Sequence, residues 1–309
     1  MRNVLLVVGL LSFTLPGLSQ NFERLSLLNP KIGLILDLSF VKGERDIRER
    51  FNTEEGFNLN YGEVSFISAV DPYFDLEAFL HFLEEGVEID EAYVRTRTLP
   101  FGLTLKAGKV RASFGRHNTL HAHRWKFPDP PLVMRRVFGE EGLLEKGISL
   151  RWVAPTDLYL SLIGEVLQGE GERPPSLGLL RGEVSFDVGE VSLLIGSSYL
   201  SEGVKGLDLT LKHFLGPYRT LEIEGEIVDW QGPGFYLQAS IPILRRWGLS
   251  LRYGNDRGSS RFSSGVWFHP TEFSRIRLAY NHGDVEGRPV REVILQGTFS
   301  IGPHRAHPF

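Results

Sequence analysis

The sequence predicts an all-β protein, a single transmembrane antiparallel up-and-down β-barrel of about 16 strands. Apolar and polar residues alternate with period two along most of the chain, and helical periodicity is nearly absent. Short and longer connections also alternate between the predicted strands. Each strand therefore has one apolar and one polar face, which a barrel in a membrane requires.

The first twenty residues have the pattern of a secretory signal. Arg2 precedes the apolar run from Val4 to Leu15, and Gly17 and Ser19 are small residues of the kind that a leader peptidase accepts. We expect residues 1–20 to be a signal peptide that is removed on export and residues 21–309 to form the outer-membrane β-barrel domain. No later stretch reaches about 18 apolar residues, so we expect no membrane-spanning helix.

The strands follow from the alternation of polar and apolar residues. Between residues 221 and 227, apolar residues alternate with Glu222, Glu224 and Glu226, and three carboxylates on one strand face need water or cations. The same pattern predicts strands near 30–40, 57–70, 73–82, 87–98, 103–111, 147–153, 158–167, 177–187, 191–200, 206–214, 220–230, 235–241, 249–254, 261–268, 274–282 and 290–301.

The connections between these strands differ in length. Those after even-numbered strands are tight and rich in Pro and Gly, whereas the others include the charged segment 41–56 and the longest segment, 112–146. Bacterial outer-membrane barrels have short periplasmic turns and longer outer loops, so we expect the tight turns to face the periplasm. A soluble β-sandwich also alternates apolar and polar positions, but residues 21–309 contain no linker or composition break that would divide them into two sandwiches.

Aromatic residues lie toward the ends of the predicted strands and could form two girdles at the membrane boundaries. They are Tyr61, Tyr73, Tyr93, Trp152, Tyr199, Trp230, Trp247, Trp267 and Tyr280.

The composition excludes several functions. Among 309 residues, 34 Lys and Arg face 38 Asp and Glu, so the net charge of -4 gives no general attraction to nucleic acid. The absence of cysteine excludes disulfides, thiolate metal sites and a thiol nucleophile. The chain also lacks a P-loop, a dinucleotide fingerprint, a G-x-S-x-G elbow and an H-E-x-x-H motif. We therefore expect no enzymatic activity and no cofactor.

Three stretches resemble the phosphate-selective porin family, including its relatives labelled TonB-dependent receptor-like proteins. They are Val70-Asp71-Pro72-Tyr73-Phe74, Glu91-Ala92-Tyr93-Val94 and Gly108-Lys109-Val110-Arg111-Ala112-Ser113-Phe114-Gly115-Arg116-His117-Asn118. The resemblance covers residues from about 57 to 150. It implies a sixteen-stranded diffusion pore in a Gram-negative outer membrane, able to form a homotrimer, with a long third outer loop folded into the lumen.

Strand parity and this resemblance predict side chains that line the pore or bind the solute. They are Arg95, Arg97, Lys106, Lys109, Arg111, Arg116, Arg124, Lys126, Glu222, Glu224 and Glu226. From Arg116 to Arg136 the loop carries five Lys and Arg residues against one acid, Asp129, so an inward-folded loop would favour anions.

The same loop carries His117, His121 and His123. They could form a metal site, because imidazole binds zinc, copper or nickel, although their spacing is not a standard ligand signature. They could also be a pore lining that titrates, or plain solvated histidines.

These observations predict a porin-like channel in the lipid bilayer of the cell outer membrane. It would allow passive diffusion of small polar solutes and ion transport, with a preference for anions such as phosphate. The alternatives are a non-conducting barrel with a structural or surface-binding role and an outer-membrane enzyme.

Overall fold

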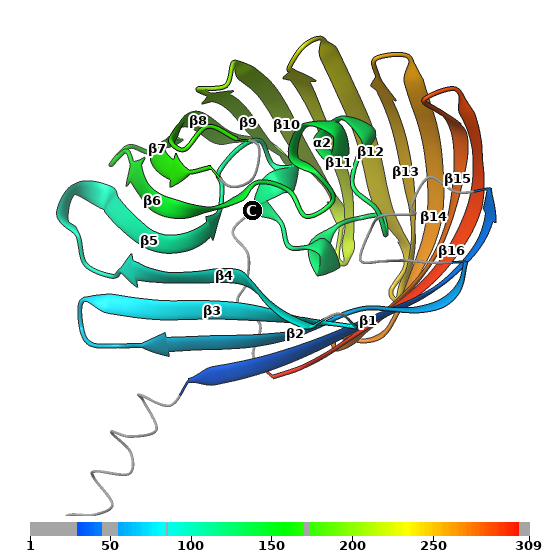
Figure 1. Ribbon diagram of the computed structural model, residues 1–309, viewed down its shortest axis with the longest axis horizontal. Helices are drawn as coiled ribbons and strands as arrows, with labels where there is room; N and C mark the ends of the chain where they lie inside the picture. The colour runs from blue at the N-terminus through cyan, green and yellow to red at the C-terminus, as the bar shows by residue number, and fades with distance from the viewer. Residues whose placement is uncertain (1–29, 45–54, 85, 170–172, 303–309) are drawn as a thin grey trace, which may run out of the picture.

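The computed structural model describes residues 30–44, 55–84, 86–169 and 173–302 (Figure 1). Within these ranges the strands form one closed antiparallel barrel in sequence order, and the first strand pairs with the last. The predicted all-β barrel of about 16 strands is confirmed. The predicted signal peptide, residues 1–20, lies outside the described residues. No helix in the described part is both long enough and apolar enough to cross a membrane.

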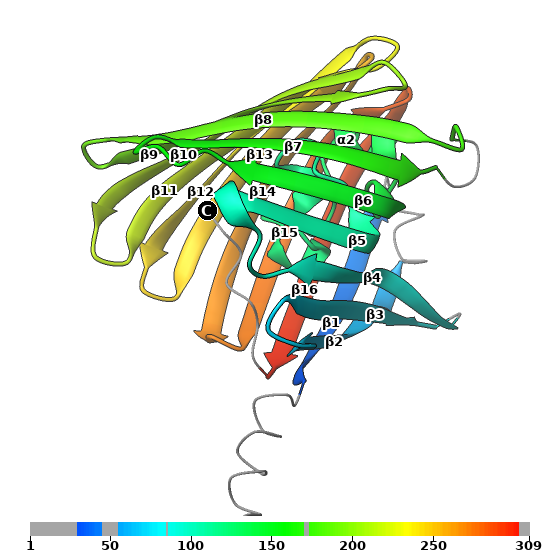
Figure 2. The ribbon, with the colours of Figure 1, turned by 90° about the vertical axis from the view of Figure 1, so that its left-hand side faces the viewer.

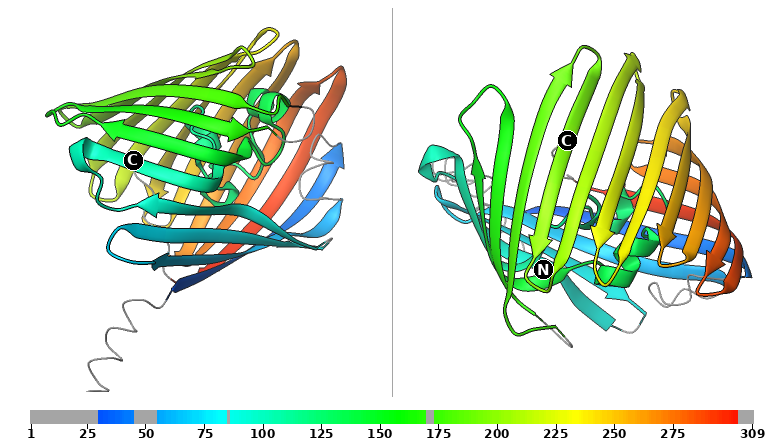
Figure 3. Two further views of the ribbon diagram at one scale, coloured as in Figure 1. Left: turned by 60° about the vertical axis from the view of Figure 1, so that its left-hand side comes forward. Right: turned by 90° about the horizontal axis from the view of Figure 1, so that it is seen from above.

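The sixteen strands slant around the barrel (Figures 2 and 3). They are β1 (Lys31–Glu44), β2 (Gly56–Ala69), β3 (Phe74–Leu83), β4 (Gly86–Thr96), β5 (Leu103–Arg111), β6 (Leu144–Val153), β7 (Tyr159–Gln168), β8 (Leu177–Val188), β9 (Val191–Leu200), β10 (Val204–Gly216), β11 (Arg219–Asp229), β12 (Pro233–Leu244), β13 (Trp247–Asp256), β14 (Ser259–Thr271), β15 (Ser274–Val285) and β16 (Arg288–Ile301).

The strand order separates two ends of the barrel. The tight connections after even-numbered strands gather at one end, together with Pro30 and Gly302, and we call it the short-turn end. The opposite end, which we call the long-loop end, carries the connection between β5 and β6. That connection comprises residues 112–143, because β6 begins at Leu144, earlier than predicted. The first residues of β6 pair with the end of β5, where Val110 lies opposite the buried Glu145.

The two faces of the wall differ as the alternation predicts. On β10, Leu207 and Leu209 point outward with 59% and 39% of their surface exposed, whereas Asp208 and Thr210 between them are 3% and 0% exposed. Apolar residues outside and polar residues inside are the arrangement of a barrel surrounded by lipid.

The predicted aromatic girdles need a correction. Tyr73, Tyr199, Trp247 and Tyr280 are exposed as a girdle requires. Tyr61 and Tyr93 are instead buried. Tyr93 donates a hydrogen bond of 3.0 Å to Glu77.

A β-bulge lies next to Tyr61. The pairing of β1 with β2 shifts between Asp37 and Leu38, which leaves Asn60 as an extra residue. Asn60 and Tyr61 are therefore both buried although they are adjacent. Tyr61 has the same strand parity as the inward Glu63, so the alternation itself places it inside; the girdle prediction, which used its position near a strand end, is wrong for this residue. The bulge adds Asn60 to the inward side.

Residues 112–143, which we call the inward connection, lie within the ring of strands (Figure 1). They include η4 (His117–Thr119), η5 (Ala122–Arg124) and α2 (Leu132–Phe138), and α2 contacts β12, β13 and β14. The apolar side chains Phe114, Val133 and Phe138 of the inward connection share one buried cluster with residues of β4 to β12. The short η3 (Pro100–Gly102) joins β4 to β5.

Candidate functional site in the barrel lumen

The inward connection is fixed to strands on several sides of the wall. Glu226 of β11 accepts hydrogen bonds from the backbone N–H groups of Arg116 at 3.1 Å and His117 at 2.5 Å. Arg136 of α2 forms an ion pair of 2.6 Å with Asp256 of β13. These bonds hold the connection against wall positions more than 100 residues away in the sequence.

Two further contacts close the base of the connection. Glu165 of β7 accepts hydrogen bonds from the backbone N–H of Ser113 at 3.0 Å and from its hydroxyl at 2.7 Å. Asn118 donates to the carbonyl of Ala112 at 2.7 Å and accepts from the N–H of Leu143 at 2.7 Å. The amide side chain thus ties the two ends of the connection together.

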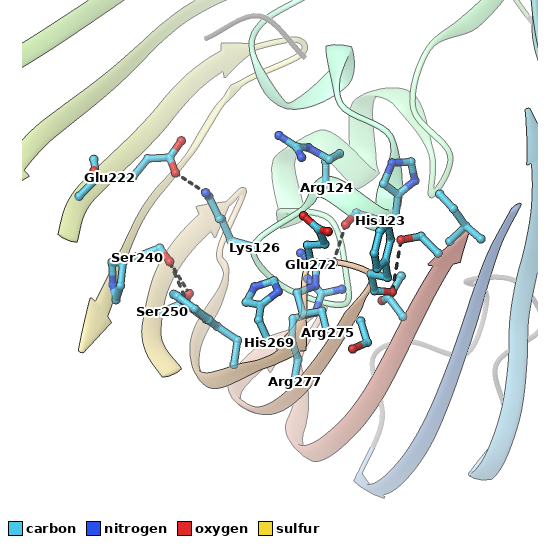
Figure 4. A pocket seen from close by; sticks show the side chains of 18 of the residues that line it. His123, Arg124, Lys126, Glu222, Ser240, Ser250, His269, Glu272, Arg275 and Arg277 are labelled. Carbon is cyan, nitrogen blue, oxygen red and sulfur yellow. Dashed lines mark hydrogen bonds and ion pairs between the residues drawn. The ribbon is translucent and has the colours of Figure 1, made fainter. Parts of the chain in front are cut away.

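A cavity of about 730 Å³ opens between the inward connection and the wall formed by β11 to β16 and β1 (Figure 4). It lies toward the short-turn end. Its charged lining consists of the cations Arg124, Lys126, Arg275 and Arg277 and the acids Glu222 and Glu272, with His123 and His269 among them.

Four Lys and Arg side chains face two carboxylates in this lining, and their partners differ. Lys126 forms an ion pair with Glu222. Arg275 and Arg277 instead donate to the backbone carbonyls of His123 and Trp125, both at 2.5 Å, and a carbonyl carries no formal charge. The cavity lining therefore has an excess of positive charge.

The predicted pore-lining residues are distributed over the lumen and the wall. Arg124, Lys126 and Glu222 line the cavity. Glu224 and Glu226 lie buried beside it, where Gln238 donates to Glu224 and Tyr236 donates to Glu226 at 2.7 Å.

The other predicted residues lie outside the lining of this cavity. Arg95 contacts Asp75 at 2.6 Å and Glu77 at 3.3 Å, and Arg97 contacts Asp75 at 3.5 Å. Lys106 lies 4.6 Å above the ring of Tyr93.

Lys109 and Arg111 of β5 contact β4. The ammonium group of Lys109 donates to the carbonyl of Ile89 at 2.7 Å, and Arg111 pairs with Asp90 at 2.8 Å. Arg116, which was also predicted to line the pore, lies in the inward connection, and its backbone N–H donates to Glu226.

The three predicted histidines do not come together. The ring of His117 stacks on Trp125 at 4.6 Å, on the side of the connection that faces β11 and β12. His121 and His123 stack on each other at 5.5 Å and face β2 to β4.

His121 and His123 meet wall residues that parity placed on the polar face without relating them to the loop. Both histidines contact Glu63 of β2, and His121 also contacts Asp90 of β4, which parity did not place inside. His81 of β3 contacts the same two carboxylates. Burial opposes the charged form of His121, but hydrogen bonds to Asp90 and Glu91 raise its pKa to about 10. This part of the lumen strongly favours positive charge.

The closed barrel, its lipid-facing exterior and its polar lumen define a porin-like outer-membrane β-barrel. No family profile matches the chain. A protein of Aquifex aeolicus (strain VF5), named "Uncharacterized protein", is 35% identical over 376 residues, covering 91% of this chain and 80% of that protein. The chain belongs to the family of this Aquifex aeolicus protein.

Solved structures share the fold at low sequence identity. A loop L8 deletion mutant of OmpT, an outer membrane protein of Vibrio cholerae, has a TM-score of 0.61 at 10% identity and covers 89% of this chain and 100% of its own. The trimer form of OmpT from the same organism has a TM-score of 0.59 at 11% identity, covering 89% and 99%. A mutant of the Rhodobacter blastica porin has a TM-score of 0.57 at 9% identity, covering 89% and 100%.

Proposed function

We propose that the protein is an outer-membrane channel for the passive diffusion of small polar solutes and that it favours anions such as phosphate. The observation that carries this proposal is the cavity beside the inward connection, where four Lys and Arg residues face two carboxylates. The resemblance of residues 57–150 to phosphate-selective porins and the porin-like fold both support it.

The position of the charges strengthens their effect on a passing ion. Arg124 and Lys126 belong to the inward connection and lie within the lumen, between the apolar cluster around Phe114 and the wall. A fixed charge acts more strongly beside protein of low dielectric than on an open surface. Glu224 and Glu226 oppose this preference, but screening over about 8 to 10 Å at physiological salt limits their influence.

The export route and the assembly belong to the same proposal. Residues 1–20 would direct secretion and be removed, and the tight turns would face the periplasm. The resemblance to porins and the trimer form of one structural neighbour support a homotrimer.

Reversal potentials across a planar lipid bilayer test the proposed selectivity. We expect the wild-type protein to conduct steadily and to favour the anion in both a chloride and a phosphate gradient. The double variant Arg124→Gln/Lys126→Gln should still conduct, with its reversal potential moved toward cation preference, because it removes two of the cations that line the cavity.

Lys205→Gln is the matched control. Lys205 is exposed on β10, on the same face as the outward Leu207, so this variant removes one positive charge outside the lumen and should leave the reversal potential unchanged. A wild-type protein that folds but does not conduct would contradict the channel. An unchanged reversal potential in the double variant would place the cavity outside the ion path.

A further inference from the structure

A buried group of imidazole and carboxylate side chains joins the inward connection to the wall at β2, β3 and β4, away from the cavity surface that carries Lys126. Its members are Glu63, His81, Asp90, His121 and His123. The rings of Tyr61 and Phe79 cover it, at 5.0 Å from His81 and 4.8 Å from His121.

The donor atoms of this group have the spacing of metal ligands. The Oε2 atom of Glu63 lies 3.3 Å from Nε2 of His81 and 3.8 Å from Nδ1 of His121. The Oδ2 atom of Asp90 lies 3.2 Å from the same Nδ1 and 4.0 Å from the same Nε2. A tetrahedral ion with bonds of about 2.0 to 2.2 Å holds its ligands about 3.3 to 3.6 Å apart. The ligand atoms of Glu63, Asp90 and His121 all lie within 4.8 Å of one another, so these three residues can surround one ion, and His81 lies at the edge of the group.

Further side chains surround these three residues. Nδ1 of His123 lies 3.6 Å from Oε2 of Glu63. Nε2 of His121, the nitrogen that does not face Asp90, lies 3.1 Å from Glu91. Histidines that bind a metal usually donate their other N–H to a carboxylate, which fixes the orientation of the ring.

Arg111 orients the two adjacent acids of β4. Its guanidinium donates to Oδ1 of Asp90 at 2.8 Å, and its backbone N–H donates to Oε1 of Glu91 at 2.6 Å. Each acid therefore has one oxygen held by Arg111 and the other directed at His121.

A β-bulge brings both acids to the same side of the strand. The pairing of β3 with β4 runs from Phe79 with Glu91 to Leu80 with Ile89, so Asp90 is the extra residue. Both Asp90 and Glu91 are consequently buried. Bulges are common next to functional sites because they redirect a side chain without interrupting the sheet.

The charges of the group leave room for a divalent cation. Glu63, Asp90 and Glu91 are three buried carboxylates, and the nearby cations that the described residues supply are the guanidinium of Arg111, which contacts Asp90, and the imidazole of His121 when it is protonated. Within the described residues, Oε1 of Glu63 is also buried without a hydrogen-bond partner. Buried carboxylates are costly unless cations or hydrogen bonds compensate them.

We propose that Glu63, Asp90 and His121 bind a divalent transition-metal ion of the zinc class, which fastens the inward connection to β2 and β4. An imidazole beside two carboxylates favours such an ion over Ca²⁺ or Mg²⁺, which prefer oxygen ligands alone. His117, on the other side of the connection, takes no part in this site. The proposal does not depend on whether the barrel conducts.

Metal content of the full-length protein in detergent tests the site. After treatment with a chelator, the protein should take up about one equivalent of Zn²⁺ by elemental analysis. Co²⁺ at the same site should give the intense visible absorption of a tetrahedral ion, and Zn²⁺ should abolish this absorption. Asp90→Asn and His121→Ala should each lose the bound ion, whereas Glu91→Gln should weaken binding about 10- to 100-fold because it orients His121 without binding the metal.

His117→Ala is the matched control, since it removes an imidazole from the same connection and should retain the ion. Migration of unheated samples in gel electrophoresis reports whether each variant is folded. If a variant does not fold, the wild-type protein still decides, because the proposal requires Zn²⁺ to raise its melting temperature and Mg²⁺ to leave it unchanged. A wild-type protein that binds no ion, or binding that survives in folded Asp90→Asn and His121→Ala, would overturn the proposal.

Discussion

Asp129 of the inward connection forms an ion pair of 2.6 Å with Arg252 of β13, and their side chains are only 2% and 3% exposed. Arg261 of β14 reaches the same carboxylate oxygen at 2.5 Å. The guanidinium of Arg252 also lies 4.6 Å above the ring of Phe127. One carboxylate thus contacts two buried guanidinium groups at the point where the connection passes β13 and β14.

Asp129→Asn should lower the free energy of unfolding by about 3 to 5 kcal/mol, because it removes the charge of a buried carboxylate that pairs with Arg252 and Arg261. Denaturant unfolding in detergent micelles or lipid vesicles measures the change. Asp157→Asn removes the same charge from an exposed turn and should change the unfolding free energy by less than about 0.5 kcal/mol. Equal stability of the two variants would contradict the buried ion pair.

The apolar anchor of the connection should be equally sensitive. Phe114 is 0% exposed and its ring lies 4.9 Å from that of Phe138. Phe114→Ala should therefore cost about 3 to 5 kcal/mol of unfolding free energy.

Gly206 of β10 allows a sharper test of the same contact. A Cβ atom there would lie 2.8 Å from the ring of Phe114, so Gly206→Ala should cost about 1 to 3 kcal/mol. The cost should largely disappear when Phe114 is already Ala, since the space is then empty. Gly178→Ala, whose nearest neighbouring atom would be 3.9 Å away, serves as the control. Strictly additive effects of the two substitutions would exclude this contact.

A charge on the outer face of the wall should lower the free energy of unfolding most near the middle of the membrane. Leu209→Arg places a guanidinium near the middle of β10 and should cost about 2 to 4 kcal/mol of unfolding free energy. Leu215→Arg, on the same strand and similarly exposed but close to the short-turn end, should cost about 0 to 1 kcal/mol. Unfolding in lipid vesicles compares the two, and equal costs would argue against a membrane around this wall.

Orientation in the membrane can be read with single cysteines, because the native chain has none. Arg288 is exposed where β16 begins at the long-loop end, and Asp157 is exposed in the turn between β6 and β7 at the short-turn end. On intact cells an impermeant maleimide should label Arg288→Cys and leave Asp157→Cys unlabelled until the outer membrane is opened. The reverse result would invert the topology.

The arrangement of the wall was predictable because it follows from local rules. Successive side chains of a strand point to opposite faces, and lipid accepts only apolar ones, so the sequence between residues 207 and 211 already distinguishes the outward leucines from Asp208. Gly and Pro adopt the backbone angles that a short reversal needs, and this marks the turns at Pro72, Pro155 and Pro217. Pro242 and Pro270, which were predicted in turns, instead lie within β12 and β14. The strands in the structure match the predicted ranges closely, and the largest differences lie at strand ends.

Two bulges show where this reasoning stops. Asn60 in β2 and Asp90 in β4 are extra residues in their ladders, and each places two consecutive side chains inside the barrel. The alternation places Glu63 and Glu91 inside and therefore assigns the neighbouring bulge residues Asn60 and Asp90 to the wrong face. Nothing in the local sequence marks a bulge of this kind, because it depends on the register of the neighbouring strand.

Composition, strand periodicity and turn chemistry thus determined the class of protein, the number of strands and the residues of each face. Only the tertiary structure decided which inward residues meet. It brought His121 to Glu63 and Asp90, and it moved His117 away to Trp125 and Glu226. Periodicity assigns a side chain to a face, but its height and its neighbours around the barrel depend on strand register and on contacts of the inward connection with distant strands. These are long-range relations, which no single stretch of the sequence contains.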